Sequence, residues 1–289
     1  MLSFDKKEVD GLRIEDGTDS VSLKKQEGKW LLPESSDFPA NQSSVEQLLG
    51  KLATLKKGWP VAKTRSALRR FKVDEEQFER KLVLLSGDEA QATLYVGTSP
   101  GFRKVHIRPA NGDEVYAVMF NTWDAAAKAD EWIDKDVLTL EESDLDRVEI
   151  PGVVLHWKDG KPKVADLGEK EQTNEKESRS LLGKLTKLRI QSVLGTEIKP
   201  EYRQDEPALE VKITRKGGEV LNYRFSKSED ASYYILKRSD LDHYFKVAEY
   251  TLNPIKETTR EKLVQATSEE TSSEPTGDKG VEKKSSARP

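Results

Sequence analysis

The sequence predicts an α+β protein of two tandem, similar domains, each made of antiparallel β meanders packed against one or two helices. The pentapeptide Leu-Leu-Gly-Lys-Leu occurs at residues 48–52 and again at 181–185, with an asparagine at the same distance upstream of each copy, Asn41 and Asn174. Short apolar segments separated by Gly, Asp and Asn, a pattern typical of strands and turns, surround both copies. Their order around the first copy recurs around the second, which indicates an internal repeat.

The first half has the pattern of a meander, helices and a second meander. Residues 9–14, 20–23 and 29–32 form three short apolar segments, with turn signals at 16–17 and 27–28. Further strand patterns follow at 82–85, 92–96, 105–107 and 115–120. We therefore expect an antiparallel sheet built from hairpins.

The first pentapeptide lies in a predicted helix. Ser43 can cap its start with Glu46 three residues later, and Val45, Leu48 and Leu52 then fall on one helical face. We expect that face to pack against the meander.

The second half follows the same order. Residues 145–150 have the pattern of residues 9–14, and strand patterns at 209–213, 220–225, 233–236 and 244–247 follow the second pentapeptide. Pro162 to Val164 stand where the first half has Trp30, so the sequence does not decide whether a third strand forms in this half. We expect a first domain over 1–139, a second, diverged domain over 140–265, and a disordered polar tail over 266–289, whose composition cannot offset the entropy of ordering.

Eight residues are predicted to have structural roles. A glycine inside a helix costs about 1 kcal/mol relative to alanine, so glycines at the same place in two helices suggest that another backbone passes close by. Two tolerated surface glycines are the alternative, and the close approach is favoured. Leucines of both pentapeptides and two tryptophans among apolar neighbours are expected in the core. The predicted structural residues are Gly50, Gly183, Leu48, Leu52, Leu181, Leu185, Trp30 and Trp132.

Composition narrows the classes of partner. The 48 basic and 52 acidic residues nearly cancel, leaving a formal charge of −4 and no overall field that would select nucleic acid. The chain has no cysteine, which excludes disulfides and thiolate chemistry. No apolar run approaches the roughly 18 residues of a membrane-spanning helix, so we expect a soluble chain as given, without direct membrane insertion.

No pattern indicates catalytic, cofactor-binding or metal-ligating residues. His106, His156 and His243 are scattered and lack metal-ligand spacing. Residues 97–101 are glycine-rich, but Phe102-Arg103-Lys104 leads into a strand pattern, so a hairpin is favoured over a phosphate-binding loop. The acidic run at 141–144 lacks the glycine and terminal glutamate of a calcium loop, and a solvated face is favoured. We expect a protein that is not an enzyme and binds no cofactor.

Trp59 is the tryptophan most expected to be exposed. It lies between Gly58 and Pro60, just past the first predicted helix. Stacking on a ligand and anchoring of a loop are both compatible with this place, and the loop anchor is favoured.

Several segments together resemble the DUF4340 family. They are Val9 to Ile14, Gly28 to Pro33, Pro39 to Asn41 with Val45 to Leu52, Leu94 to Gly97, Val115 to Val118 and Trp132 to Leu138. The resemblance covers most of residues 4–150 and continues more weakly through the second half.

The resemblance implies a bacterial envelope protein, encoded beside an ABC transporter of the gliding-motility type, with its large part on the periplasmic face of the inner membrane behind an N-terminal anchor. We expect no anchor ahead of the first strand in the sequence as given, and a trimmed chain, a misassigned start and a soluble variant are the open explanations. The expected function is a noncatalytic extracytoplasmic accessory module that contacts ABC transporter membrane subunits or other envelope proteins. The alternative is an envelope polysaccharide- or peptide-binding protein that uses an interdomain groove or a sheet edge.

Overall fold

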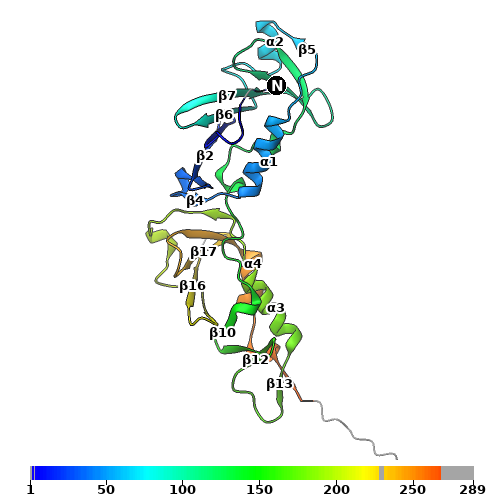
Figure 1. The fold of residues 1–289 in the computed structure, drawn as a ribbon. Helices are drawn as coiled ribbons and strands as arrows, with labels where there is room; N and C mark the ends of the chain where they lie inside the picture. Colours follow the sequence, from blue (N-terminus) through cyan, green and yellow to red (C-terminus); the bar gives the residue numbers. More distant parts are fainter. Residues whose placement is uncertain (1, 3, 228–230, 268–289) are drawn as a thin grey trace, which may run out of the picture.

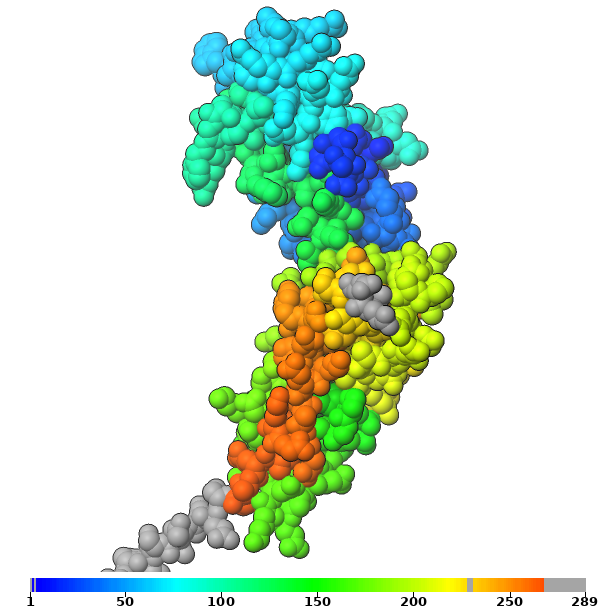
Figure 2. All heavy atoms as spheres, turned by 180° about the vertical axis from the view of Figure 1, so that it is seen from behind, coloured from blue at the N-terminus to red at the C-terminus, as the bar shows by residue number. Residues whose placement is uncertain are grey.

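The molecule consists of two lobes that lie end to end (Figure 1). A computed structural model describes residues 2, 4–227 and 231–267. The first lobe, residues 4–139, is built on a nine-stranded sheet, and the second lobe, residues 140–267, on an eight-stranded sheet. Figure 2 shows the same end-to-end arrangement from behind. The predicted α+β class is confirmed.

The first sheet has the strand order β4-β3-β2-β1-β6-β7-β8-β9-β5, and its neighbouring strands are antiparallel. Its strands are β1 (Gly11–Glu15), β2 (Ser20–Gln26), β3 (Lys29–Leu32), β4 (Phe38–Pro39), β5 (Pro60–Ala62), β6 (Arg80–Ser86), β7 (Glu89–Val96), β8 (Lys104–Pro109) and β9 (Val115–Met119). Both edge strands, β4 and β5, are short and contain a proline.

The second sheet has the order β12-β11-β10-β15-β16-β17-β18-β14. Its strands are β10 (Leu145–Ile150), β11 (Val153–Lys158), β12 (Lys161–Val164), β14 (Ser192–Val193), β15 (Leu209–Arg215), β16 (Val220–Ser226), β17 (Tyr233–Arg238) and β18 (Tyr244–Ala248). Apart from β4, the first sheet places its strands in the corresponding order. The third strand of this half does form, as β12, an edge strand that contains Pro162.

Each pentapeptide lies in a helix that covers the inner face of its sheet. These helices are α1 (Gln42–Ala53) and α3 (Glu175–Thr186), and the leucines of both are buried. The cap of α1 differs from the prediction: Asn41, not Ser43, accepts from the Ser44 amide at 2.9 Å. Asn174 caps α3 in the same way. An Asx side chain ahead of the helix therefore provides the cap in both lobes.

The remaining elements connect or close the two lobes. β13 (Glu171–Thr173) pairs with β19 (Val264–Ala266), so the first residue of the predicted tail belongs to a strand. The tail from 268 on lies outside the described residues. The other helices are α2 (Arg65–Arg70), α4 (Glu249–Lys256), α5 (Arg260–Leu263), η1 (Pro33–Ser35), η2 (Thr122–Ala125), η3 (Ala129–Glu131), η4 (Glu142–Asp144) and η5 (Pro200–Tyr202).

The two lobes meet where the β4 edge of the first sheet faces β18 of the second. Phe38 is buried and packs edge-on against His243 at 5.1 Å and Phe245 at 5.7 Å between ring centroids. Ser192 donates from Oγ to Oδ1 of Asp130 at 2.7 Å. The predicted boundary at 139/140 lies in the connection that crosses this junction.

The interpretation of the two helical glycines is wrong. A Cβ added to Gly50 would meet no atom within 4 Å, and one added to Gly183 would meet only Glu142 Oε1 at 3.9 Å. The close approach is at Gly97 instead, where a Cβ would lie 1.9 Å from the Phe71 carbonyl oxygen. The tryptophan predictions are correct, because Trp30 and Trp132 are 1% and 3% exposed.

Candidate binding groove on the second sheet

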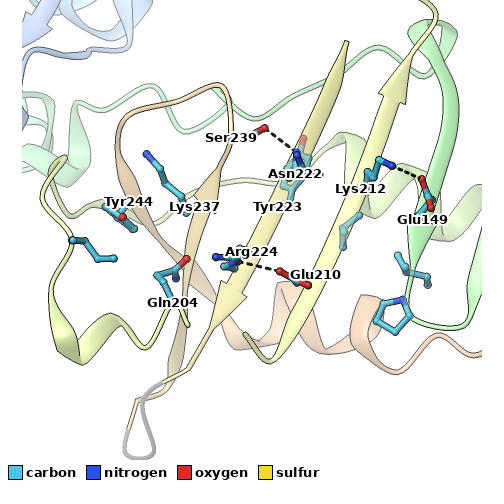
Figure 3. Close-up of a pocket in the computed structure, with 14 residues that line it drawn as sticks. Glu149, Gln204, Glu210, Lys212, Asn222, Tyr223, Arg224, Lys237, Ser239 and Tyr244 are labelled. Atoms are coloured by element: carbon cyan, nitrogen blue, oxygen red, sulfur yellow. Dashed lines mark hydrogen bonds and ion pairs between the residues drawn. The ribbon is translucent and has the colours of Figure 1, made fainter. Parts of the chain in front are cut away.

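The outer face of the second sheet carries an open groove of about 630 Å³, a size typical of ligand sites. Strand alternation creates it: inward residues of β15 and β16 are buried, whereas Glu210, Lys212, Asn222 and Arg224 point outward. Figure 3 shows these side chains on neighbouring strands. The lining residues are Glu149, Ile150, Pro151, Ile198, Gln204, Glu210, Val211, Lys212, Asn222, Tyr223, Arg224, Lys237, Ser239 and Tyr244.

The charged side chains of the groove form cross-strand ion pairs. Arg224 Nε lies 3.0 Å from Glu210 Oε1, and Lys212 Nζ lies 3.2 Å from Glu149 Oε1 (Figure 3). Exposed pairs of this kind contribute little to stability. They do place both signs of charge along the groove, which suits a polar partner that carries both charges.

One side of the groove is fixed by a buried polar cluster. Gln204 is 6% exposed and donates from Nε2 to Ser226 Oγ at 2.6 Å and to the Ile235 carbonyl at 3.2 Å. Its Oε1 has no hydrogen-bond partner among the described residues. A buried acceptor without a partner is costly, so a donor from a bound molecule would be stabilised at this place.

The opposite side is held by Lys237 on β17. Its Nζ donates to the carbonyl oxygens of Leu241 and Asp242, both at 2.6 Å, and lies 5.0 Å from the centroid of the Tyr244 ring. The strand end and the following loop are therefore tied together beside the groove.

The residues singled out from the sequence lie elsewhere. Leu48, Leu52, Leu181 and Leu185 are core residues, and Trp59 is 93% exposed at the far end of the first lobe. Sequence reasoning missed the groove residues because outward charges on a strand are also the pattern of an ordinary solvated face. The alternation in 209–215 and 220–226 predicts which side chains point outward, but it does not predict that a groove forms over them.

The histidines do not converge. His106 is stacked on Phe71 at 4.1 Å, and its burial lowers the pKa of its imidazole. His156 is on β11, and His243 is in the junction of the lobes. Within the described residues there is no group of three or more side chains that could hold a metal ion. Residues 97–101 form part of the β7–β8 connection, as expected.

A second hollow of about 530 Å³ lies beside the junction. It is lined from both lobes, by Asp130 and Lys135 on one side and by Arg189 and Tyr250 on the other. Tyr250 is 78% exposed, so its ring is available to a bound molecule.

Across the described residues, the structure has no helix with both the length and the apolar character needed to cross a membrane. Neither a curated protein nor a solved structure matches the chain. A family model with the description "Domain of unknown function (DUF4340)" matches residues 30–207. This match begins in β3 of the first lobe and ends just ahead of β15 of the second. Because it covers more than half of the sequence, the chain belongs to the DUF4340 family.

Proposed function

We propose that this protein is a noncatalytic, extracytoplasmic interaction module that works beside an ABC-type export or gliding-motility-like system. The observation that carries the proposal is the groove on the outer face of the second sheet. Its carboxylates, Glu149 and Glu210, each have a cation within 3.2 Å. Carboxylates held in this way suit recognition of a charged partner surface better than proton transfer.

The groove fits an extended polypeptide of the partner. Both charges alternate along it, and Asn222 and Ser239 add hydrogen-bonding groups at its edge. The two aromatic residues among those lining it, Tyr223 and Tyr244, are 1% and 8% exposed. A saccharide ring would need a more open aromatic face on which to stack.

The proposal is tested by site-specific photocrosslinking in membranes of cells that make the full-length protein. We expect a photoreactive residue at Asn222 to capture an ABC transporter membrane subunit. The control probe is at Thr93, the equivalent position on the first sheet, where we expect no such product. Absence of any transporter subunit from the Asn222 products would contradict the proposal.

The hollow beside the junction favours a second candidate function, binding of an envelope peptide or polysaccharide between the lobes. Its support is the exposed ring of Tyr250. A probe at Tyr250 in the same experiment distinguishes the two candidates, because this one predicts a glycan or small peptide adduct there and no transporter product at Asn222.

We also infer that the two lobes derive from one duplicated unit. The corresponding strand orders and the asparagine caps at equal distance before both pentapeptides support this origin.

A further inference from the structure

The end of the first lobe that lies away from the second lobe is formed by β5 and α2 (Figure 1). We call residues 56–70, which include both elements, the distal tip. In Figure 2 the corresponding light-blue segment lies at the opposite end of the molecule from the orange C-terminal segment.

The distal tip corresponds to a surface that is covered in the second lobe. In the first sheet Pro60 pairs with Tyr116, and in the second sheet Val193 pairs with Phe245. By this register, Trp59 is equivalent to Ser192. Tyr116 is likewise equivalent to Phe245. Ser192 and Phe245 contact the first lobe through Asp130 and Phe38. No described segment covers Trp59.

The charge of this region is one-sided. Residues 47–73 contain eight Lys or Arg and no Asp or Glu, in a chain whose net charge is −4. Three of the eight are paired, in the salt bridges Lys51–Asp124, Lys63–Glu114 and Lys72–Glu79. The other five are exposed and form no salt bridge with a described carboxylate: Lys56, Lys57, Arg65, Arg69 and Arg70.

Exposed large apolar side chains lie in the same segment and on the strand next to it. Trp59 is 93% exposed and Val61 is 50% exposed, and Met119, at the end of the strand next to β5, is 62% exposed. Tryptophan beside lysine and arginine is the combination that rests at a membrane-water interface, because the ring enters the headgroup layer while the cations meet lipid phosphates.

We propose that the distal tip binds the surface of an anionic phospholipid membrane, with the five unpaired cations on the headgroups and the Trp59 indole between them. None of the described residues crosses the membrane in this arrangement. A second copy of the chain fits less well, because its β4 edge is already buried against its own second lobe. In the second lobe the residue equivalent to Phe38 is Glu171, which pairs with Arg260. The second lobe therefore offers a charged pair where the first lobe offers an aromatic ring.

The test is sedimentation of the full chain with vesicles that mix phosphatidylglycerol and phosphatidylcholine, against vesicles of phosphatidylcholine alone. Each basic residue near an anionic surface changes the binding constant about fivefold. The triple variant Lys56→Gln, Lys57→Gln and Arg65→Gln should therefore bind about a hundredfold more weakly at low salt. Binding of the unchanged protein should fall as salt is added.

The matched control is the triple variant Lys170→Gln, Lys176→Gln and Lys216→Gln, which removes the same charge from exposed sites of the second lobe. It should bind within about twofold of the unchanged protein, since those sites lie away from the tip. Trp59→Ala should weaken binding, whereas Tyr250→Ala, at another exposed ring, should not. Equal melting temperatures of all variants verify their folding.

Three results would each overturn the proposal. They are equal binding to both kinds of vesicle, equal binding by the two triple variants, and no vesicle binding together with a concentration-dependent dimer that Trp59→Ala abolishes. The last result would assign the tip to a second copy of the chain.

Discussion

On the outer face of the first sheet, Arg108 is 4% exposed beneath the segment 65–78, while at the equivalent position of the second sheet Lys237 lines an open groove. The equivalence follows from the strand pairing, since Tyr95 faces Arg108 as Arg224 faces Lys237. Arg108 donates from Nε to the Val73 carbonyl at 2.7 Å and lies 4.6 Å from the centroid of the Tyr95 ring.

The path of the connection after the short edge strand explains this difference. In the first lobe it forms α2 and then returns across the sheet, so that Leu68, Val73 and Tyr95 share a small apolar cluster. In the second lobe it forms only the short η5, and the corresponding cluster contains Tyr202, Ile235 and Tyr244. The same strand order therefore gives a closed face or an open face according to the segment that covers it.

The largest effect is expected in the shared framework. Leu48→Ala and Leu181→Ala each remove a buried leucine from the same place in α1 and α3. Each should lower the free energy of unfolding by about 4 kcal/mol. Hydrogen exchange measured separately for the two lobes checks this, and a large loss in one lobe with little in the other would break the equivalence of the helices.

The outer faces should respond differently to matched substitutions. Arg108→Met leaves the Val73 carbonyl without its charged donor and should cost about 2 to 3 kcal/mol of folding free energy. Lys237→Met should cost less than about 1 kcal/mol of folding free energy, because the contacts of the Lys237 side chain are partly solvated. Denaturant unfolding measures both, and similar losses would mean that the two faces are equally closed.

The helical glycines provide a smaller test, with the opposite sign to that expected from the sequence. Space is open at Gly50 and Gly183, so alanine at either should raise stability by about 0.5 to 1 kcal/mol through helix propensity. Gly97→Ala, where the Phe71 carbonyl blocks a Cβ, should instead lower the melting temperature. A loss of stability in Gly50→Ala would instead indicate the close backbone approach that was expected from the sequence.

The smallest effect concerns Glu171, which stands where the first lobe has Phe38. Its ion pair with Arg260, together with the Gly168 amide, lowers the pKa of Glu171 to about 2. Because the folded pKa lies below the usual 4.5, the stabilisation is complete above about pH 4.5 and disappears as the pH falls towards 2.

Glu171→Gln should therefore lower the melting temperature slightly at neutral pH and leave it unchanged near pH 2. The exposed Glu169→Gln serves as its control and should show no difference at either pH. A deficit of Glu171→Gln that persisted at low pH would remove the ion pair as its cause.

Much of the framework follows from local sequence. Periodic leucines and the strand-turn alternation predict both helices and most strands, and Trp30 was correctly placed in the core. The short strands β4, β5 and β14 were missed because two or three residues carry no period of their own. The pair β13 and β19 joins distant segments, and local patterns do not contain that contact.

The candidate site was harder to predict than the fold. In the sequence, Glu210 and Arg224 have the pattern of a solvated strand face. Only the folded structure shows that a loop containing Ile198 and Gln204 borders them. The glycine interpretation failed because a helix tolerates a half-exposed glycine at modest cost, so its presence does not require a neighbour. The exposure of Trp59 was predicted correctly. Its equivalence to Ser192, on the covered surface of the second lobe, follows only from the strand order of the two sheets.

The prolines on the edge strands have a consequence for behaviour at high concentration. Pro39 in β4, Pro60 in β5 and Pro162 in β12 each remove an amide hydrogen from the outermost strand of a sheet. A strand from another molecule cannot continue the hydrogen-bonded ladder past such a residue, so three of the four edges of the two large sheets are protected from edge-to-edge aggregation. Crowded molecules should remain dispersed, and any assembly they form should use side-chain surfaces instead of shared sheets.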